Sequence, residues 1–413
     1  MRLKFMMAIF IALFSMANMA FAEADDNALA MRNNKDYSNC NTCPPKKEEC
    51  CPCPKECIKS PSKCSCCDYM TCCPMLPLPV KCGNLFMEGE YLYWKTYTVV
   101  PYAITRTVVP PFTSGLRTIV NEDVNTVKMD GSSGYRLTLG AYFSDCWFGL
   151  GTFRQYDTDG TNSVSVRGVD GFPLPLQQWI SAVWATNPAN SDTNNGGPPV
   201  SASARQRHRE KVLDFDFLKE FACSRFTFSP FLGVRFAWVK SDLRVDYFQN
   251  FTPGTGTVSY NNHVDVNNHM NLGVGLHTGM LSNIDLGWGF GFYGTSGLAA
   301  LVGQFQFEHR EDVTDEFTGT DFPVTYTSTR SYKVTDFQTT WELGVGLNWG
   351  HHFCDCGYYL GLKVGYEANI WPNFFRSFHT LRTTSVQNNA ERMSLWTRSI
   401  LTHGLNVGAR FDF

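Results

Sequence analysis

After its first 22 residues the chain has no apolar run long enough to cross a bilayer as an α-helix. Such a helix needs roughly 20 consecutive, mostly apolar residues, and charged or polar residues interrupt every later apolar stretch well before that length. The chain also has no excess of basic residues, because 35 Lys and Arg stand against 38 Asp and Glu, for a formal net charge of −3. The first absence excludes a bundle of membrane helices, and the second gives no basis for nucleic-acid binding.

Local motifs of catalysis are missing as well. There is no nucleophile elbow, no metalloprotease helix motif and no phosphate loop, and residues 289–294 match only the letters of a dinucleotide fingerprint, without the strand–helix unit that it needs. Alternating glycines inside a strand explain that stretch better. We therefore expect no enzyme, no cofactor and no bound metal. An outer-membrane hydrolase stays open as an alternative, because a Ser/His/acid site need not be local in sequence.

What the sequence does contain begins with an export signal. Arg2 and Lys4 precede an apolar stretch over residues 5–19, and Ala20 and Ala22 place small residues at a cleavage site before Glu23. This pattern predicts a secretory signal peptide over residues 1–22, which is removed before the mature protein folds.

The C-terminal residues alternate strictly between apolar and polar side chains. Leu405, Val407, Ala409, Phe411 and Phe413 would lie on one face of a strand, and Asn406, Arg410 and Asp412 on the other. One face can then contact lipid and the other a polar lumen. Phe411 and Phe413 are typical of the closing strand by which the barrel-assembly machinery recognises its substrates, and we interpret them as an assembly signal.

The same alternation recurs upstream in a chain with 34 Gly and 14% aromatic residues. It predicts strands at 85–98, 135–143, 147–156, 213–217, 226–238, 271–280, within 286–310, and at 341–349, 360–367 and 401–413. The fold class is therefore all-β: a transmembrane antiparallel up-and-down β-barrel of about 10 strands (8–12), over residues 85–413.

Connections between these strands alternate in length. Short turns are expected at 144–146, 222–225, 281–285 and 351–357, and long polar loops at 101–133, 158–208, 247–267, 311–332 and 372–399. Short periplasmic turns and long surface loops are typical of outer-membrane barrels. We expect a protein of the bacterial outer membrane, in contact with its lipid, with the long loops at the cell surface.

Charged residues on the polar faces of these strands are the candidate functional residues. The predicted lumen-facing set is Glu88, Glu90, Arg136, Asp214, Asp216, Arg235, Glu342, Lys363, Glu367, Arg410 and Asp412. Its seven acids and four bases would favour cations if water passes. Alternatively, the charges pair across a narrow interior and plug it, since small barrels are filled by side chains.

Residues 23–84 form a Cys- and Pro-rich segment that cannot build a hydrophobic core. It holds 12 of the 16 cysteines, and the predicted turns hold the rest, all on the periplasmic side. Disulfides are the expected state there, either within the chain or with neighbours in the envelope, and metal binding is the weaker alternative. The candidates are Cys40, Cys43, Cys50, Cys51, Cys53, Cys57, Cys64, Cys66, Cys67, Cys72, Cys73, Cys82, Cys146, Cys223, Cys354 and Cys356.

Five stretches carry a resemblance to a known family. They are FMEGEYLYW (86–94), FLGVR (231–235), GWGFG (287–291), GYE (365–367) followed by Trp371, and GLNVGARFDF (404–413). Their order resembles the Legionella-type major outer-membrane protein family over residues 85–413. The chain departs from that family at residues 40–82, which look more like the disulfide-linked envelope proteins of chlamydia-type bacteria.

This resemblance implies a pore-forming surface barrel. We expect diffusion of small polar solutes through it, together with a contribution to a disulfide-cross-linked envelope whose neighbours are its partners. The alternative is a plugged structural or adhesive surface barrel without channel activity.

Overall fold

The computed structural model describes residues 85–109, 118–143, 147–166, 177–185, 199–223, 225–251, 258–317, 324–353, 358–382 and 391–413. The predicted signal peptide and Cys-rich segment lie outside these residues and stay predictions. In the described part of the chain, no helix has the length and apolar character required to cross a membrane.

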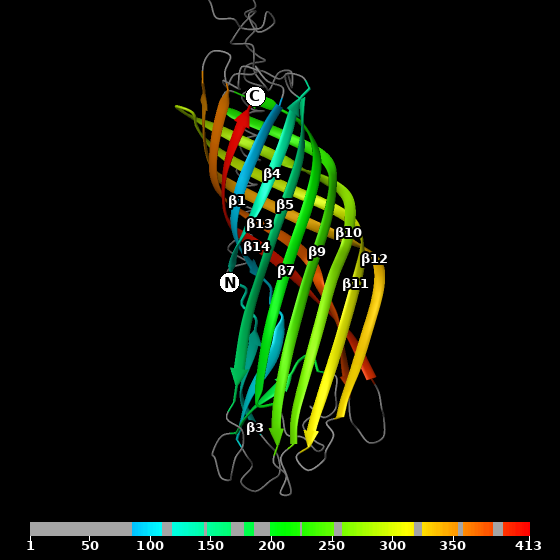
Figure 1. Ribbon diagram of the computed structural model, residues 1–413. Helices are drawn as coiled ribbons and strands as arrows, with labels where there is room; N and C mark the ends of the chain where they lie inside the picture. Colours follow the sequence, from blue (N-terminus) through cyan, green and yellow to red (C-terminus); the bar gives the residue numbers. More distant parts are fainter. Residues whose placement is uncertain are drawn as a thin grey trace, which may run out of the picture.

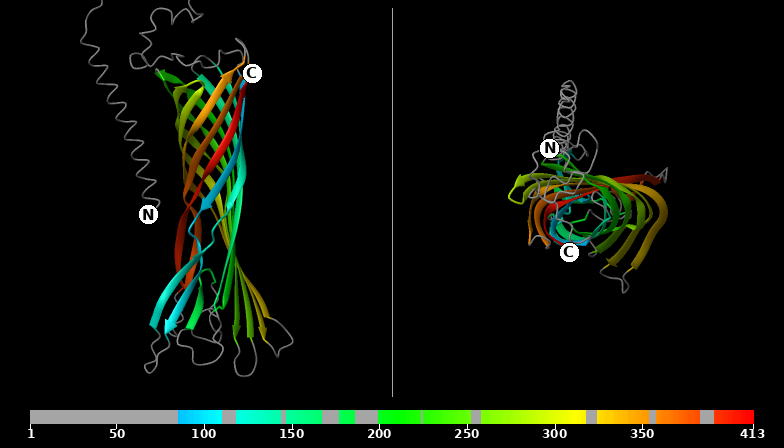
Figure 2. Two further views of the ribbon diagram at one scale, coloured as in Figure 1. Left: turned by 90° about the vertical axis from the view of Figure 1, so that its left-hand side faces the viewer. Right: turned by 90° about the horizontal axis from the view of Figure 1, so that it is seen from above.

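Ten strands form one closed antiparallel barrel (Figure 1). They are β1 (Leu85–Tyr97), β4 (Gly131–Tyr142), β5 (Trp147–Ser165), β7 (Ser201–Lys219), β9 (Phe226–Phe251), β10 (Val258–Gly287), β11 (Phe290–Phe317), β12 (Val324–His352), β13 (Tyr359–Arg382) and β14 (Glu391–Asp412). Pairing of β1 with β14 closes the ring, which Figure 2 shows from above. The predicted fold class and all ten predicted strands are confirmed.

Four shorter strands complete the described elements. β2 (Pro101–Val109), β3 (Thr118–Thr126) and β6 (Gln177–Ala182) form a separate three-stranded sheet, and β8 (Phe221–Cys223) pairs with β9. We call the end of the barrel where β1 begins and β14 ends the proximal end, and the opposite end, at the bottom of Figure 1, the distal end.

A broad apolar band surrounds the proximal half of the barrel on its outside. Every second residue of each strand contributes to it, because successive side chains of a strand point to opposite faces. Among its exposed members are Tyr91, Leu139, Phe215, Leu232, Leu276, Phe292, Trp341, Val364 and Val407. Such an outer band is what a membrane barrel presents to lipid.

The long connections were predicted wrongly in large part. The barrel strands continue far into the segments expected to be loops, so that residues 158–165, 201–208, 258–267, 311–317, 324–332, 372–382 and 391–399 are strand, and 101–133 holds β2 and β3. We call this distal part of the strands the distal extension. The outward residues of the distal extension are mostly polar, among them Arg205, Arg207 and Arg244, so the apolar alternation that marks a membrane strand is lost there.

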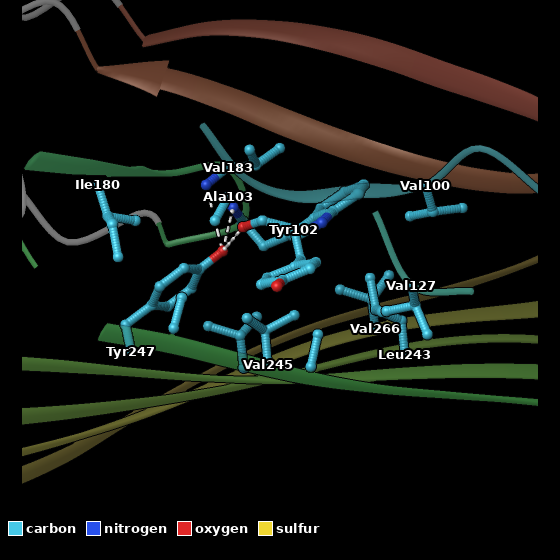
Figure 3. Close-up of a cluster of buried hydrophobic side chains, with 14 of the residues drawn as sticks. Val100, Tyr102, Ala103, Val127, Ile180, Val183, Leu243, Val245, Tyr247 and Val266 are labelled. Atoms are coloured by element: carbon cyan, nitrogen blue, oxygen red, sulfur yellow. Dashed lines mark hydrogen bonds between the residues drawn. The ribbon is translucent and has the colours of Figure 1, made fainter. Parts of the chain in front are cut away.

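An apolar core fills the distal extension (Figure 3). The sheet of β2, β3 and β6 supplies Tyr102 and Ile180, which pack with Leu243 and Val245 of β9 and with Val266 of β10. Fully burying side chains of this size stabilises a fold by about 1.5–3 kcal/mol each. β2 and β6 are therefore packed onto this core rather than forming a surface loop, while residues 121–124 of β3 are exposed.

The turn from β10 to β11 is also displaced from its prediction. Residues 281–285 are strand, and the chain reverses at Trp288 and Gly289, whose φ angles are 54° and 81°. Positive φ at both central residues is the type I′ hairpin geometry, which explains a glycine at the second position. Trp288 at the apex is 96% exposed at the proximal end.

Candidate functional site

The predicted lumen-facing residues all lie on the inner faces of the barrel strands, and none of them is exposed. Glu90, Asp214, Arg235, Glu367 and Asp412 are buried. Glu88, Arg136, Asp216, Glu342, Lys363 and Arg410 are partly buried. The structure brings all of them except Asp216 into ion pairs with one another, in two networks and one proximal pair, while Asp216 contacts His277.

The first network joins β1, β4, β13 and β14. Arg136 donates to Glu90 at 3.1 Å and to Glu367 at 2.6 Å, and Lys363 lies 3.1 Å from Glu90 and also pairs with Glu88. The Asn406 side-chain amide donates to both Glu90 and Glu367, at 3.0 and 3.1 Å. Each buried carboxylate thus has both a cation and an amide as partners, which is what an interior of low dielectric constant requires.

The second network crosses the lumen. The Arg235 guanidinium binds both carboxylate oxygens of Asp214, at 2.7 and 2.8 Å, and reaches Glu342 at 2.7 Å. Arg154 then connects Glu342, at 3.0 Å, to Glu210, at 2.6 Å. Arg154 lies on β5 and Glu342 on β12, five places apart in the ring of ten strands, so one ion pair spans the full width of the barrel.

A second contact spans the barrel in the same way. The Trp371 indole nitrogen on β13 donates to Glu210 on β7 at 3.0 Å, and these strands are again five places apart. Beyond it, towards the distal end, a buried apolar cluster gathers Met270, Leu301, Phe305 and Phe374 from three strands. At the level of the networks, ion pairs therefore close the lumen, and farther out apolar side chains fill it.

Sequence reasoning missed three members of the second network, namely Arg154, Glu210 and His277. Arg154 lies on the predicted strand 147–156, where alternation does not show which face points inward. Glu210 lies between the predicted loop that ends at residue 208 and the predicted strand that begins at residue 213, which is too short. His277 was on the predicted inner face of its strand but was not singled out; its ring contacts Arg235 at 3.0 Å and Asp216 at 2.8 Å. A signal for Glu210 was available in the sequence. It lies on the same face of β7 as the predicted lumen residues Asp214 and Asp216, with Val212 between them.

The proximal mouth of the barrel is hollowed. A cavity of about 470 Å³ lies between Glu88, Tyr142, Phe148 and the turn at Trp288. Arg410 borders it, pairs with Asp412 at 2.7 Å and stacks 3.8 Å from the ring centre of Phe86. The interior is thus open to solvent at the proximal mouth and closed one level farther in.

Asp214, Asp216 and His277 form the one group in the described part of the chain with the donor atoms and spacing for a metal ion, within 4.8 Å of one another. The group does not fit a resident cation, because Arg235 already occupies both oxygens of Asp214 and contacts the histidine ring. Of the candidate disulfide residues, Cys223 at the end of β8 is the one among the described residues, so their pairing is not tested. Cross-linking to neighbours therefore stays a prediction of the sequence.

Comparison with known proteins gives one family and several solved barrels. The family described as Legionella pneumophila major outer membrane protein precursor matches residues 78–411. No curated protein matches the chain. The outer membrane protease OmpT from Escherichia coli aligns at 11% identity and a TM-score of 0.36, covering 81% of this chain and 98% of its own.

Two further barrels align at lower scores. The translocator domain of the autotransporter NalP from Neisseria meningitidis has 9% identity and a TM-score of 0.23, with 80% of this chain and 89% of its own covered. A FadL homologue from Pseudomonas aeruginosa has 8% identity and a TM-score of 0.22, with coverage of 80% and 90%.

These alignments correct one expectation. The deduction that the chain is not an enzyme is wrong, because the similar barrels include a protease.

Proposed function

Because the chain belongs to the Legionella pneumophila major outer membrane protein family, we propose that this outer-membrane β-barrel forms a narrow channel for small polar solutes, closed at rest by the ion pairs that cross its lumen. In the proposed orientation the proximal end faces the periplasm and the distal extension stands at the cell surface. The observation that carries the proposal is the Arg154–Glu342 pair, which joins opposite walls of the barrel at 3.0 Å.

The chemistry of the closure supports a channel more than a permanent plug. Well-packed apolar residues would fill a lumen at equal or lower free energy than buried ion pairs, whose desolvation is costly. The chain instead keeps both networks at the level of the apolar band, next to a proximal cavity. Ion pairs can exchange partners for water or for a passing ion, and the proposal also requires the apolar cluster around Phe305 and Phe374, farther out, to part during conduction.

A structural or adhesive surface barrel is the second candidate, and the distal extension favours it. An apolar core of its own makes this extension a folded platform beyond the apolar band, with Tyr102, Ile180, Trp184 and Tyr247 buried inside. Such a platform can carry surface loops whether or not the barrel conducts.

Conductance in planar bilayers separates these candidates. We expect the refolded protein to give brief, small openings, and the Arg154→Ala and Arg235→Ala variants to give several-fold longer openings that favour cations, since each variant removes a lumen base and leaves the acids. The matched control is Arg205→Ala, which removes an exposed arginine of the distal extension and should behave as wild type.

Folding of each variant is checked first by its heat-dependent mobility in gels and by circular dichroism. If the folded Arg154→Ala and Arg235→Ala barrels open for no longer than the wild type, the channel is contradicted and the surface barrel remains as the function. A wild type that conducts steadily, without long closures, would contradict closure by the networks.

A further inference from the structure

The outward face of β7 changes character abruptly along its length. Arg205, Arg207, Arg209 and Lys211 point outward in succession and are followed on the same face by Leu213, Phe215 and Phe217. Phe215 and Phe217 are about half exposed and belong to the apolar band. Arg209 and Lys211 therefore stand at the distal border of the band, where lipid gives way to water.

Neighbouring strands add positive charge at the same border. β7, β9 and β10 run side by side (Figure 1), and the register places Arg209 directly opposite Lys240 and Lys240 directly opposite His269. Residues directly opposite in a sheet have Cβ atoms about 5 Å apart, and like charges there destabilise the pair. Lys240 is exposed between a guanidinium and an imidazole.

Two acids lie beside this group, and both are already engaged. Asp157 lies directly opposite Arg209 in the register but accepts from Arg207 at 3.0 Å. Asp242 accepts from Arg209 at 2.8 Å through one oxygen and contacts His269 at 2.5 Å through the other. Burial raises the pKa of Asp242, but these two contacts outweigh it and hold the pKa below its usual value. Among the described residues, Lys211 and Lys240 have no carboxylate partner.

The side of this cluster that faces the band is aromatic. Lys211 lies directly opposite Trp238, which is half-buried on the outward face of β9 next to Phe236. Tryptophan is enriched at the level of the lipid headgroups, where its ring is partly in hydrocarbon and partly in water. The cluster of Arg209, Lys211 and Lys240 is thus held at headgroup depth with a surplus of positive charge.

We propose that Arg209, Lys211 and Lys240 bind a phosphate group of an anionic lipid in the outer leaflet of the membrane. A phosphate between Lys240 and Arg209 would turn a repulsive pair into two charge-assisted hydrogen bonds, while the acyl chains cover Phe215 and Trp238. This inference rests on the proposed orientation, which places the distal border in the outer leaflet, but it does not depend on channel activity.

Native mass spectrometry of the folded protein in detergent tests the site. The probes are lipid A with its phosphates, the same lipid with its phosphates removed, and inorganic phosphate. We expect retention of phosphorylated lipid A, and a loss of affinity of about fivefold for each of Lys211→Gln and Lys240→Gln. The matched control is Arg244→Gln. It removes an outward charge from β9, the strand of Lys240, at a position four residues farther from the apolar band.

Equal retention of the dephosphorylated lipid, or an equal loss in Arg244→Gln, would overturn the proposal. Displacement of the lipid by millimolar inorganic phosphate would also overturn it, because the site would then bind a free anion rather than a headgroup. Surface labelling of intact cells at a cysteine introduced by Asn261→Cys, on the exposed face of β10 in the distal extension, checks the orientation separately. A failure of the orientation, a failure of the lipid site and a silent channel are therefore distinguishable.

Discussion

The two halves of the barrel have opposite polarity. At the level of the apolar band, Phe215 and Leu232 face outward, while Asp214 and Arg235 meet inside. In the distal extension of the same strands, Arg205 and Arg244 face outward, while Ala204 and Val245 are buried inside. Between β7 and β9 no change of register separates the halves, because these strands pair continuously from Ser201 to Leu218, whereas β10 shifts register at Met270/Gly273 and β13 at Trp371/Phe375. The medium around the strand, and not the strand itself, decides which face is apolar.

The largest effect is expected from a charge placed on the outside of the band. Leu232, 61% exposed near the middle of the band on β9, should lose about 2–4 kcal/mol of unfolding free energy on change to Arg, because the guanidinium must enter lipid. Urea unfolding of the protein refolded into lipid vesicles measures this change.

The matched control reverses the substitution on the same face of the same strand. Arg244→Leu in the distal extension should alter the unfolding free energy by no more than about 0.5 kcal/mol. If both substitutions cost the same, lipid does not surround the band, and the comparison between the two halves fails.

The inside of the distal extension gives the next largest effect. The Tyr247 hydroxyl donates to the backbone oxygen of Tyr102 and accepts from the backbone nitrogens of Val183 and Trp184, at 3.2 and 3.3 Å (Figure 3). Tyr247→Phe removes the three hydrogen bonds of this buried hydroxyl, while the Val183 nitrogen keeps its 3.4 Å bond to the Tyr102 oxygen, and should cost about 1–3 kcal/mol. Hydrogen exchange should then accelerate in β2 and β6 but not at the level of the apolar band.

Tyr91→Phe is the control for this change, because its side chain is 55% exposed on the outside of the band. Equal exchange rates in wild type and Tyr247→Phe would show that the three-stranded sheet is not held by its buried contacts.

The smallest effect concerns ion pairs on the outside of the distal extension. Arg205 lies 2.7 Å from Asp159, but both side chains are more than half exposed. Water and salt screen such a pair, so Arg205→Gln should change the unfolding free energy by at most about 1 kcal/mol. Urea unfolding at low and at high salt measures it, and a loss that persists at high salt would contradict the assignment of this face to water.

The change of polarity also explains what the sequence could and could not predict. Inside the band, Tyr91, Leu139 and Val407 alternate with polar residues, and all ten strands were found. At residues 201–208 (SASARQRH), charged residues face outward while Ala204, Gln206 and His208 face inward, so the stretch has no apolar periodicity and was predicted to be part of a loop. A search for apolar alternation assumes lipid on the outside of the barrel, and it does not detect strands whose outer face is polar.

The candidate site was predictable residue by residue but not pair by pair. The inward faces of Glu90, Arg235 and Glu342 follow from alternation alone. Which charges meet depends on the width of the barrel, because Arg154 and Glu342 are 188 residues apart in the chain and on opposite walls. Alternation carries no information about contacts across a lumen.

Closure of the ring by β1 and β14 sets the order in which this protein can assemble. Backbone pairing runs from Phe86 opposite Asp412 to Tyr97 opposite Leu401, and the Phe413 nitrogen donates to the Leu85 oxygen at 3.0 Å. Until residues 401–413 are present, β1 and β13 are unpaired edges of an open sheet, which invite pairing with other chains. Contacts between such distant segments also form slowly. The open sheet therefore needs a chaperone until residues 401–413 have paired. A truncation of these residues would cause aggregation before any effect on transport could be measured.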